Sequence, residues 1–155
     1  MVLQMPAALA LRQADAFDAS ALAELRAAGL IELGLLDPLA ADAFLPRARH
    51  EYWTLLREDR LAAWMLQAGG RAAGCACVVF FDRLPYPQTS LHAELAGVYV
   101  AGPYRRQGIA RELVTEALAA ARARGVRKIV LHPTDRTREL YRSFGFSESG
   151  QMRMS

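Results

Sequence analysis

The sequence predicts one mixed α/β domain, and two local patterns lead to this class. A Gly69-Gly70 pair separates two apolar runs, which is typical of an antiparallel hairpin. Further along, an apolar strand passes through a short basic turn into an amphipathic helix, and a second strand and helix follow. A length of 155 residues and a hydrophobic content of 53% are sufficient for one buried core.

The N-terminal region is predicted to contain a short strand and a first helix. Weak alternation of apolar residues indicates the strand over residues 9–12. Asp18 or Ser20 is the expected N-cap of the helix, because both side chains can accept hydrogen bonds from its free backbone N–H groups. The helix should run through Arg26 and end before Gly29, which breaks the pattern.

A second helical region is predicted over residues 40–57, after Gly34 and the Asp37-Pro38 pair. Apolar residues recur there between charged ones, as in a helix with one buried face. Pro46 lacks a backbone N–H group, so the helix is expected to be interrupted near it.

The hairpin and the strand after it are predicted to form the centre of the sheet. The arms of the hairpin are residues 61–67 and 71–81, which are apolar on both sides of the glycine pair. Residues 82–92 contain prolines and small polar residues and are predicted to be a loop. Residues 94–100 form the next strand, which a Gly-Pro pair ends.

The C-terminal region contains the clearest helix, over residues 108–124. Its apolar residues fall on one helical face, and Gly125 follows as the expected C-terminal stop. A strand over residues 127–131, a helix over 135–144 and a weak final strand over 146–154 complete the predicted order.

The charge of the chain indicates an anionic partner of modest size. The formal net charge is +3, which a phosphate-bearing cofactor is sufficient to explain. This excess is too small and too dispersed for a nucleic-acid-binding protein. No apolar run is long enough to span a membrane, and residues 1–11 lack the basic start of a signal peptide, so a cytoplasmic location is expected.

The two cysteines are predicted to be core residues. Cys75 and Cys77 are two residues apart in an apolar run, so a strand places both side chains on one face. They are too close in sequence for an ordinary disulfide. The nearest histidines, His50 and His92, are far away in sequence, and no metal site is expected.

The turn within residues 98–110 is the main candidate for ligand binding. A helix that begins near Gly108 leaves its first N–H groups without intrahelical acceptors, and the helix dipole adds positive potential there. Gly108 allows a ligand to approach the backbone closely, and Arg105 and Arg106 add charged donors. These features predict an anion site, although the glycine spacing matches neither a P-loop nor a Rossmann dinucleotide motif.

Two segments together resemble the signatures of the GNAT family of acetyl-CoA-dependent N-acetyltransferases. Arg105-x-x-Gly108-x-Ala110 is similar to the family's Arg/Gln-x-x-Gly-x-Gly/Ala turn, and the preceding Val98-Tyr99-Val100 matches its fourth strand. Leu140-Tyr141-Arg142-Ser143-Phe144-Gly145-Phe146 resembles the later Leu-Tyr-x-x-x-Gly-Phe element. The likeness covers residues 93–150 and is weaker in the N-terminal part, where only the order of elements agrees.

The resemblance implies a GNAT acyltransferase fold over residues 1–155. In this fold a mixed, mostly antiparallel sheet has helices on both faces, and its fourth and fifth strands splay apart to hold acetyl-CoA as cosubstrate. Thr134 stands where many members carry an asparagine that contacts the pantetheine. The residues implied in cofactor binding are Val98, Tyr99, Val100, Arg105, Arg106, Gln107, Gly108, Ile109, Ala110 and Thr134.

The resemblance also implies transfer of an acetyl group to a primary amine of a small molecule or protein, by direct attack in a ternary complex. Tyr141 occupies the position of the general acid that protonates the departing sulfur. Glu94 is the candidate general base, and His92, on the same strand face, is the competing candidate. His132 is interpreted as a structural residue at a strand end. The alternative function is a non-catalytic acyl-CoA sensor with the same fold.

The acceptor pocket is expected to involve the N-terminal helices, Trp53 and the loop over residues 82–92, because these elements cover the open side of the cleft in this fold. The sequence does not identify the acceptor amine. A homodimer is a further implication of the family resemblance.

Overall fold

The computed structural model describes residues 8–155, so most of the segment 1–11, with its expected lack of a signal peptide, lies outside the described residues. The strands are β1 (Leu9–Gln13), β2 (Leu61–Ala68), β3 (Arg71–Asp82), β4 (Leu91–Val100) and β5 (Ile129–Val130). The α-helices are α1 (Ala19–Glu32), α2 (Ala41–Arg57), α3 (Ile109–Ala123) and α4 (Arg138–Ser143).

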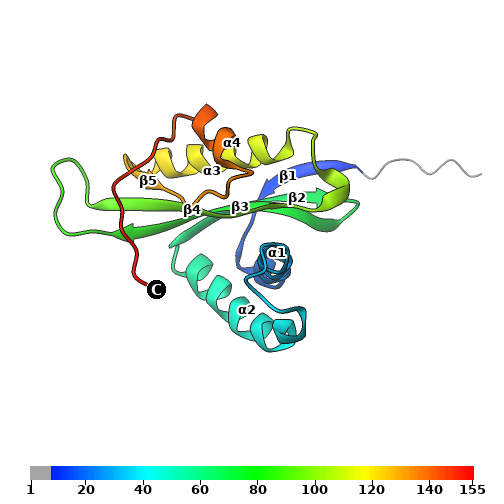
Figure 1. Ribbon diagram of the computed structural model, residues 1–155. Coiled ribbons are helices and arrows are strands. Elements are labelled where there is room, and N and C mark those ends of the chain that lie inside the picture. The colour runs from blue at the N-terminus through cyan, green and yellow to red at the C-terminus, as the bar shows by residue number, and fades with distance from the viewer. Residues whose placement is uncertain (1–7) are drawn as a thin grey trace, which may run out of the picture.

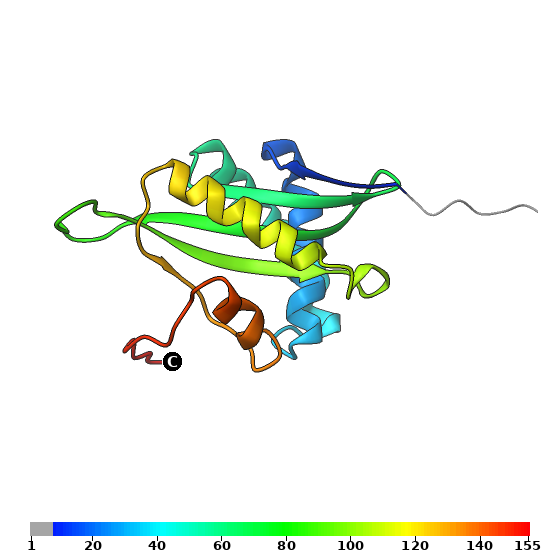
Figure 2. The ribbon, with the colours of Figure 1, turned by 90° about the horizontal axis from the view of Figure 1, so that it is seen from above.

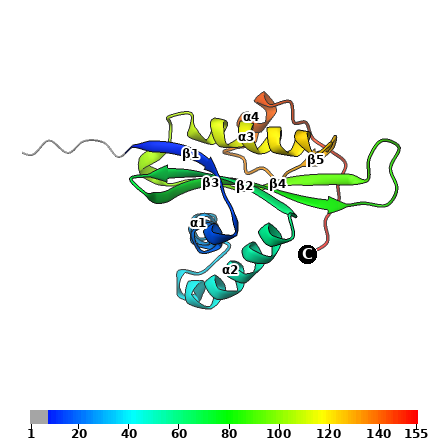
Figure 3. The ribbon, with the colours of Figure 1, turned by 180° about the vertical axis from the view of Figure 1, so that it is seen from behind.

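The strands form one five-stranded sheet in the order β1-β2-β3-β4-β5. Helices α1 and α2 lie on one face of the sheet, and α3 and α4 lie on the other (Figure 1). The view from behind in Figure 3 shows the same two covered faces. The predicted fold class, with helices on both sides of a mixed sheet, is confirmed. Within residues 8–155, no helix has both the length and the apolar character needed to cross a membrane.

The last two strands, β4 and β5, are paired over a short distance and then separate. Strands β1 to β4 pair antiparallel, and only β4 and β5 are parallel. The parallel pairing is limited to Ala93 with Ile129 and Glu94 with Val130. Beyond these pairs the edge of β4 that faces β5 is unpaired up to Val100, and Figure 2 shows α4 and its flanking segments diverging from it. The implied splay between the fourth and fifth strands is therefore present.

Apolar residues on both faces of the sheet form two core layers. One face packs against the buried side of α3, which includes Leu113, Val114 and Leu118. The other face packs against α1, where Leu22 is fully buried. Both cysteines are free and buried in this second layer, as the sequence predicted.

Two predicted helix breaks are wrong. Helix α1 continues through Gly29 to Glu32. Gly29 packs on β4, because a Cβ atom there would lie 3.4 Å from Cδ2 of Tyr99, in ordinary van der Waals contact. Helix α2 is continuous across Pro46, which is exposed. The carbonyl of the exposed Asp42 loses its helical donor there and is left accessible to water.

The C-terminal elements are shorter than predicted. Strand β5 is limited to two residues, and α4 begins at Arg138 rather than near Asp135. The final strand predicted over 146–154 is wrong, because this segment has no regular structure and residues 147–155 are exposed. Their side chains are mostly polar, so pairing them with β5 would bury little apolar surface.

Candidate active site

The opening between β4 and the segment after β5 contains a cleft of about 640 Å³. Its walls come from the second half of β4, α1, the turn before α3, and the chain from β5 into α4. All but one of the predicted cofactor residues line it, and Gln107 is the exception. The lining residues from that set are Val98, Tyr99, Val100, Arg105, Arg106, Gly108, Ile109, Ala110 and Thr134.

The turn before α3 presents free backbone donors to one end of the cleft. Both Arg106 and Gly108 have left-handed backbone angles, with φ of +62° and +76°. The first helical hydrogen bond of α3 runs from the Glu112 N–H to the Gly108 carbonyl. Within residues 8–155, the N–H groups from Arg106 to Arg111 have no acceptor. Such a concave set of donors at a helix N-terminus binds anions.

Arg105 connects β4 to α1 at the edge of the cleft. Its Nε donates a 2.6 Å hydrogen bond to the Val100 carbonyl, and its Nη2 donates a 2.6 Å hydrogen bond to Glu32. This hydrogen bond to Glu32 raises the pKa of Arg105 above its already high value. The guanidinium also lies over the Tyr99 ring. Arg105 therefore joins the end of β4 to α1, which leaves Arg106 as the less engaged arginine of the turn.

A bulge in β4 turns a backbone N–H group toward the cleft. The register shifts between the pairs Cys77–Ala96 and Cys75–Tyr99, and Gly97 has a φ of +63°. The Cys75 thiol donates a 3.2 Å hydrogen bond to the Gly97 carbonyl. Because a trans peptide keeps its C=O and N–H on opposite sides, the Val98 N–H points away from β3, toward the edge that faces β5.

The Cys75 thiol is in its protonated form, which allows it to donate the hydrogen bond to the Gly97 carbonyl. The adjacent Cys77 thiol and the burial of the site raise the pKa of the Cys75 thiol, so it stays protonated and can donate. The sequence analysis missed the bulge, although an isolated Gly97 inside a strand pattern is a recognised signal for one.

Tyr141 reaches the cleft from α4. Its side chain is 8% exposed, and burial raises the pKa of its phenol. The ring meets Phe146 edge to face, and no described residue forms a hydrogen bond with its hydroxyl. A neutral phenol with a free hydroxyl can donate a proton to a group bound in the cleft.

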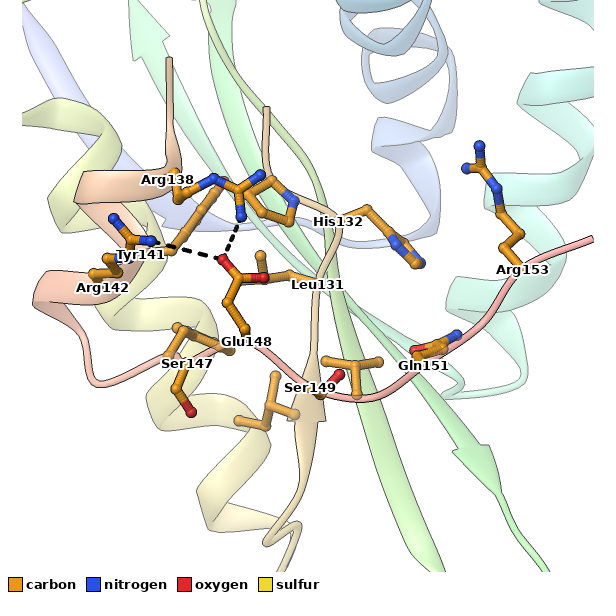
Figure 4. Close-up of a pocket in the computed structure, with 14 residues that line it drawn as sticks. Leu131, His132, Arg138, Tyr141, Arg142, Ser147, Glu148, Ser149, Gln151 and Arg153 are labelled. Atoms are coloured by element: carbon orange, nitrogen blue, oxygen red, sulfur yellow. Dashed lines mark hydrogen bonds and ion pairs between the residues drawn. The ribbon is translucent and has the colours of Figure 1, made fainter. Parts of the chain in front are cut away.

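A second cavity of about 360 Å³ lies behind Tyr141, between β5, α4 and the C-terminal segment (Figure 4). Glu148 forms ion pairs there with Arg138 and Arg142, which point toward it in Figure 4. Leu131, His132 and Tyr141 line both cavities, so they form the partition between them.

The structure places Glu94 beside a histidine that the sequence analysis had left out of the site. Glu94 pairs with Val130 at the point where β4 and β5 diverge, but it does not line the cleft. Its Oε1 lies 3.6 Å from Nε2 of His132, and His132 does line the cleft. The two residues are 38 positions apart in the chain, which is why no local pattern joined them.

The competing base, His92, lies elsewhere. It is 2% exposed and packs between Phe81 and Tyr86, and its Nδ1 lies 3.0 Å from the Ser90 carbonyl. It lines neither cavity. In the part of the chain that the structure describes, no group of three metal-ligand side chains occurs.

Of the elements expected to form the acceptor pocket, only the first helix borders the cleft. Helix α1 lines the cleft through Leu25, Arg26 and Gly29. Trp53 stacks on His50 at the surface of α2 and is 47% exposed. Neither Trp53 nor the loop over residues 82–92 lines the cleft, so α1 is the N-terminal element that borders it.

A comparison with protein families matches the acetyltransferase (GNAT) family over residues 29–146. The chain belongs to this family. GNAT membership sets acyl transfer as the general activity, and the matched segment contains the bulge, the turn and Tyr141. A comparison with curated proteins finds no match.

Solved structures of other GNAT proteins have the same fold. A predicted acetyltransferase from Clostridium acetobutylicum, crystallised with acetyl-CoA, is 22% identical, with 96% of each chain covered and a TM-score of 0.85. A GCN5-related N-acetyltransferase from Ralstonia eutropha JMP134 is 23% identical, with 96% of this chain and 98% of that chain covered and a TM-score of 0.83. Glucosamine-6-phosphate N-acetyltransferase from Arabidopsis thaliana is 16% identical, with 96% and 97% covered and a TM-score of 0.71.

Proposed function

We propose that this GNAT protein transfers an acetyl group from acetyl-CoA to a primary amine while both substrates are bound. One observation supports the proposal: the turn before α3, Val98 and Tyr141 all line the cleft at the splayed strands. The turn offers free N–H groups to a pyrophosphate, Val98 offers a backbone N–H to a carbonyl oxygen, and Tyr141 offers a phenol to a leaving thiolate. The neighbour crystallised with acetyl-CoA supports the choice of acyl donor.

The residues present fit coenzyme A. Free N–H groups from Arg106 to Arg111 are suited to a pyrophosphate, and Gly108 leaves open space where a Cβ would stand. The unpaired edge of β4 after Glu94 offers backbone groups to the amides of a pantetheine arm. Thr134 is less available, because its hydroxyl lies 2.9 Å from the Thr137 hydroxyl and shares a hydrogen bond with it. Acetyl-CoA would supply the thioester.

A residue of the cleft can be assigned to each step of the proposed transfer. The Val98 N–H donates to the carbonyl oxygen as negative charge develops on it. The amine nitrogen forms a bond to the carbonyl carbon as the carbon–sulfur bond breaks, and the Tyr141 hydroxyl gives its proton to the sulfur. The nitrogen loses its extra proton to the Glu94–His132 pair, in which His132 faces the cleft and Glu94 balances its charge.

The test is calorimetric titration of the full chain with acetyl-CoA, followed by release of free thiol in the presence of amines, amino acids, peptides and amino sugars. We expect a binding isotherm with one site and thiol release that depends on the acceptor. Binding without release from any acceptor would favour the acyl-CoA sensor. Absence of binding would refute the proposal.

A further inference from the structure

The charges that line the cleft are strongly unbalanced. Its side chains include one carboxylate, Glu32, which Arg105 already pairs. The arginines that line it are Arg26, Arg105, Arg106, Arg111 and Arg136. A polycationic acceptor, such as a polyamine, would find no unpaired carboxylate on these walls.

Not all of these arginines face the same part of the cleft. Arg106 belongs to the turn before α3, and Arg111 donates a 3.0 Å hydrogen bond to the Ser143 hydroxyl and lies over the Phe144 ring. Both lie at the end where the anion-binding turn opens. Arg26 comes from α1, on the opposite face of the sheet.

Helix α1 brings Arg26 to the cleft that the β4 bulge also lines. Gly29 packs against the Tyr99 ring, and Glu32, one turn later, reaches Arg105 just beyond the end of β4. Helix α1 crosses the strands (Figure 2), so the turn from Gly29 back to Arg26 runs across the sheet and not along β4. Arg26 lines the same cleft as Gly97 and Val98 of the bulge.

Two neighbours support this position. Leu25, the residue before Arg26, packs in the same core cluster as Cys75, which holds the bulge. Burial raises the pKa of Tyr52, and the positive charge of Arg26 opposes that rise. Tyr52 itself reaches the bulge, because its hydroxyl lies 3.9 Å from the position of a Cβ at Gly97.

Arg26 has no partner among the described residues. It is half-buried, and within residues 8–155 neither a hydrogen bond nor an ion pair involves its guanidinium. A half-buried guanidinium that borders a cleft loses hydration without an ionic partner in return. An oxyanion on the bound substrate would supply that partner through two parallel hydrogen bonds.

We infer that Arg26 selects an acceptor amine that carries a carboxylate or phosphate close to its amino group, with the oxyanion held by the guanidinium while the amine faces the β4 bulge. This inference rests on the proposed acetyl transfer and specifies the acceptor class for that site. Arg26 is a specificity residue, because it binds the substrate at a distance from the reacting atoms.

The experiment compares matched acceptors that differ only in the anion. Thiol release is measured for amino acids against their amides, and for glucosamine 6-phosphate against glucosamine. The full chain is used, with the variants Arg26→Gln, Arg26→Lys and Arg122→Gln. The two pairs of acceptors separate a carboxylate from a phosphate as the preferred oxyanion.

In the wild type, we expect the kcat/KM of the charged member of one pair to exceed that of its neutral partner by about tenfold or more. In Arg26→Gln, the KM of the charged acceptor rises, which brings this ratio close to one. The acetyl-CoA affinity of this variant is unchanged. Arg26→Lys restores part of the ratio. Arg122→Gln, which removes an exposed arginine of α3 outside both cavities, leaves the ratio as in the wild type.

Three results would overturn the inference. Equal kcat/KM values within both wild-type pairs would show that the site does not select an oxyanion. An unchanged ratio in a folded Arg26→Gln protein would remove Arg26 from that selection. In both cases neutral amines still release thiol, so the proposed acetyl transfer survives. Failure of every acceptor, or of acetyl-CoA binding, would refute acetyl transfer itself, and this inference with it.

Discussion

Two walls of the cleft, one from β4 and one from α4, are held in place by different kinds of contact. The β4 wall is paired along β3, and the bulge has the Cys75 hydrogen bond behind it. The α4 wall follows a strand of only two residues and is held by side chains, including the Thr134–Thr137 pair and the Arg111–Ser143 hydrogen bond.

This difference determines how each wall can contribute to the reaction. The β4 wall and the turn after it present backbone N–H groups. A substitution does not remove these groups; it can only move them, by changing the backbone conformation or the side chains that hold it. The α4 wall presents the Tyr141 side chain, which a substitution removes directly. Substitutions on the two walls should therefore have separable effects on binding, on turnover and on stability.

The largest effect is expected from Gly108→Asp, on the turn after β4. An L-residue is strained at a φ of +76°, and the added carboxylate repels a bound pyrophosphate. We expect the acetyl-CoA dissociation constant to rise about 100-fold, measured by calorimetry. Gly125→Asp is the control, because it has a similar φ of +82° at the other end of α3. Equal losses of affinity in the two folded variants would contradict the role of the turn.

Tyr141→Phe tests the α4 wall directly. We expect kcat to fall about 100-fold while the acetyl-CoA affinity stays close to that of the wild type. Tyr104→Phe removes a hydroxyl from the same cleft and should leave kcat nearly unchanged. Because burial raises the pKa of Tyr141, the phenol remains protonated up to its ordinary pKa of about 10 and beyond. The loss of kcat through this group should therefore appear only above about pH 10, in a pH–rate profile. An unchanged kcat in Tyr141→Phe would remove the assignment.

Cys75→Ala tests the support of the β4 bulge. Loss of the hydrogen bond to the Gly97 carbonyl frees the peptide that carries the Val98 N–H, so kcat should fall about three- to tenfold. Cys77→Ala removes a neighbouring buried thiol but keeps that hydrogen bond, and it should affect stability alone. Cys75→Ser retains a donor and should recover most of the kcat. If the two alanine variants reduced kcat equally, the effect would be one of packing.

The smallest effect is expected from Thr137→Val, which weakens the support of the α4 wall. The Thr137 hydroxyl accepts a 3.0 Å hydrogen bond from the Thr134 N–H and lies 2.9 Å from the Thr134 hydroxyl. Its loss should lower the free energy of unfolding by about 1 kcal/mol, measured in urea, with little change in kcat. A large fall in kcat at full stability would mean that Thr137 contributes to the reaction.

The sequence predicted most elements where the signal is local. Glycine pairs, apolar alternation and the helical apolar face identified β2, β3, β4 and α3 within a few residues. The errors arose where tertiary contacts override local preference. Gly29 remains helical where α1 packs against Tyr99, and the predicted strand after Phe146 does not form.

The candidate site divides in the same way. The turn around Gly108 and the position of Tyr141 follow from short motifs, because a strand, a turn and a helix start are contiguous in sequence. The pairing of Arg105 with Glu32 does not follow from a short motif, because the two residues are 73 positions apart in the chain. The proximity of His132 to Glu94 likewise depends on the register of β4 with β5.

By itself, the sequence determined the order of the elements as far as α4, the turn between β4 and α3, and the family of this protein, because each depends on residues that are neighbours in the chain. Only the tertiary structure decided which groups meet at the cleft. It paired Arg105 with Glu32, placed Cys75 behind the bulge and left Arg26 without a partner on the α1 wall. Contacts of this kind join distant segments, and they form only when the sheet and its helices pack together.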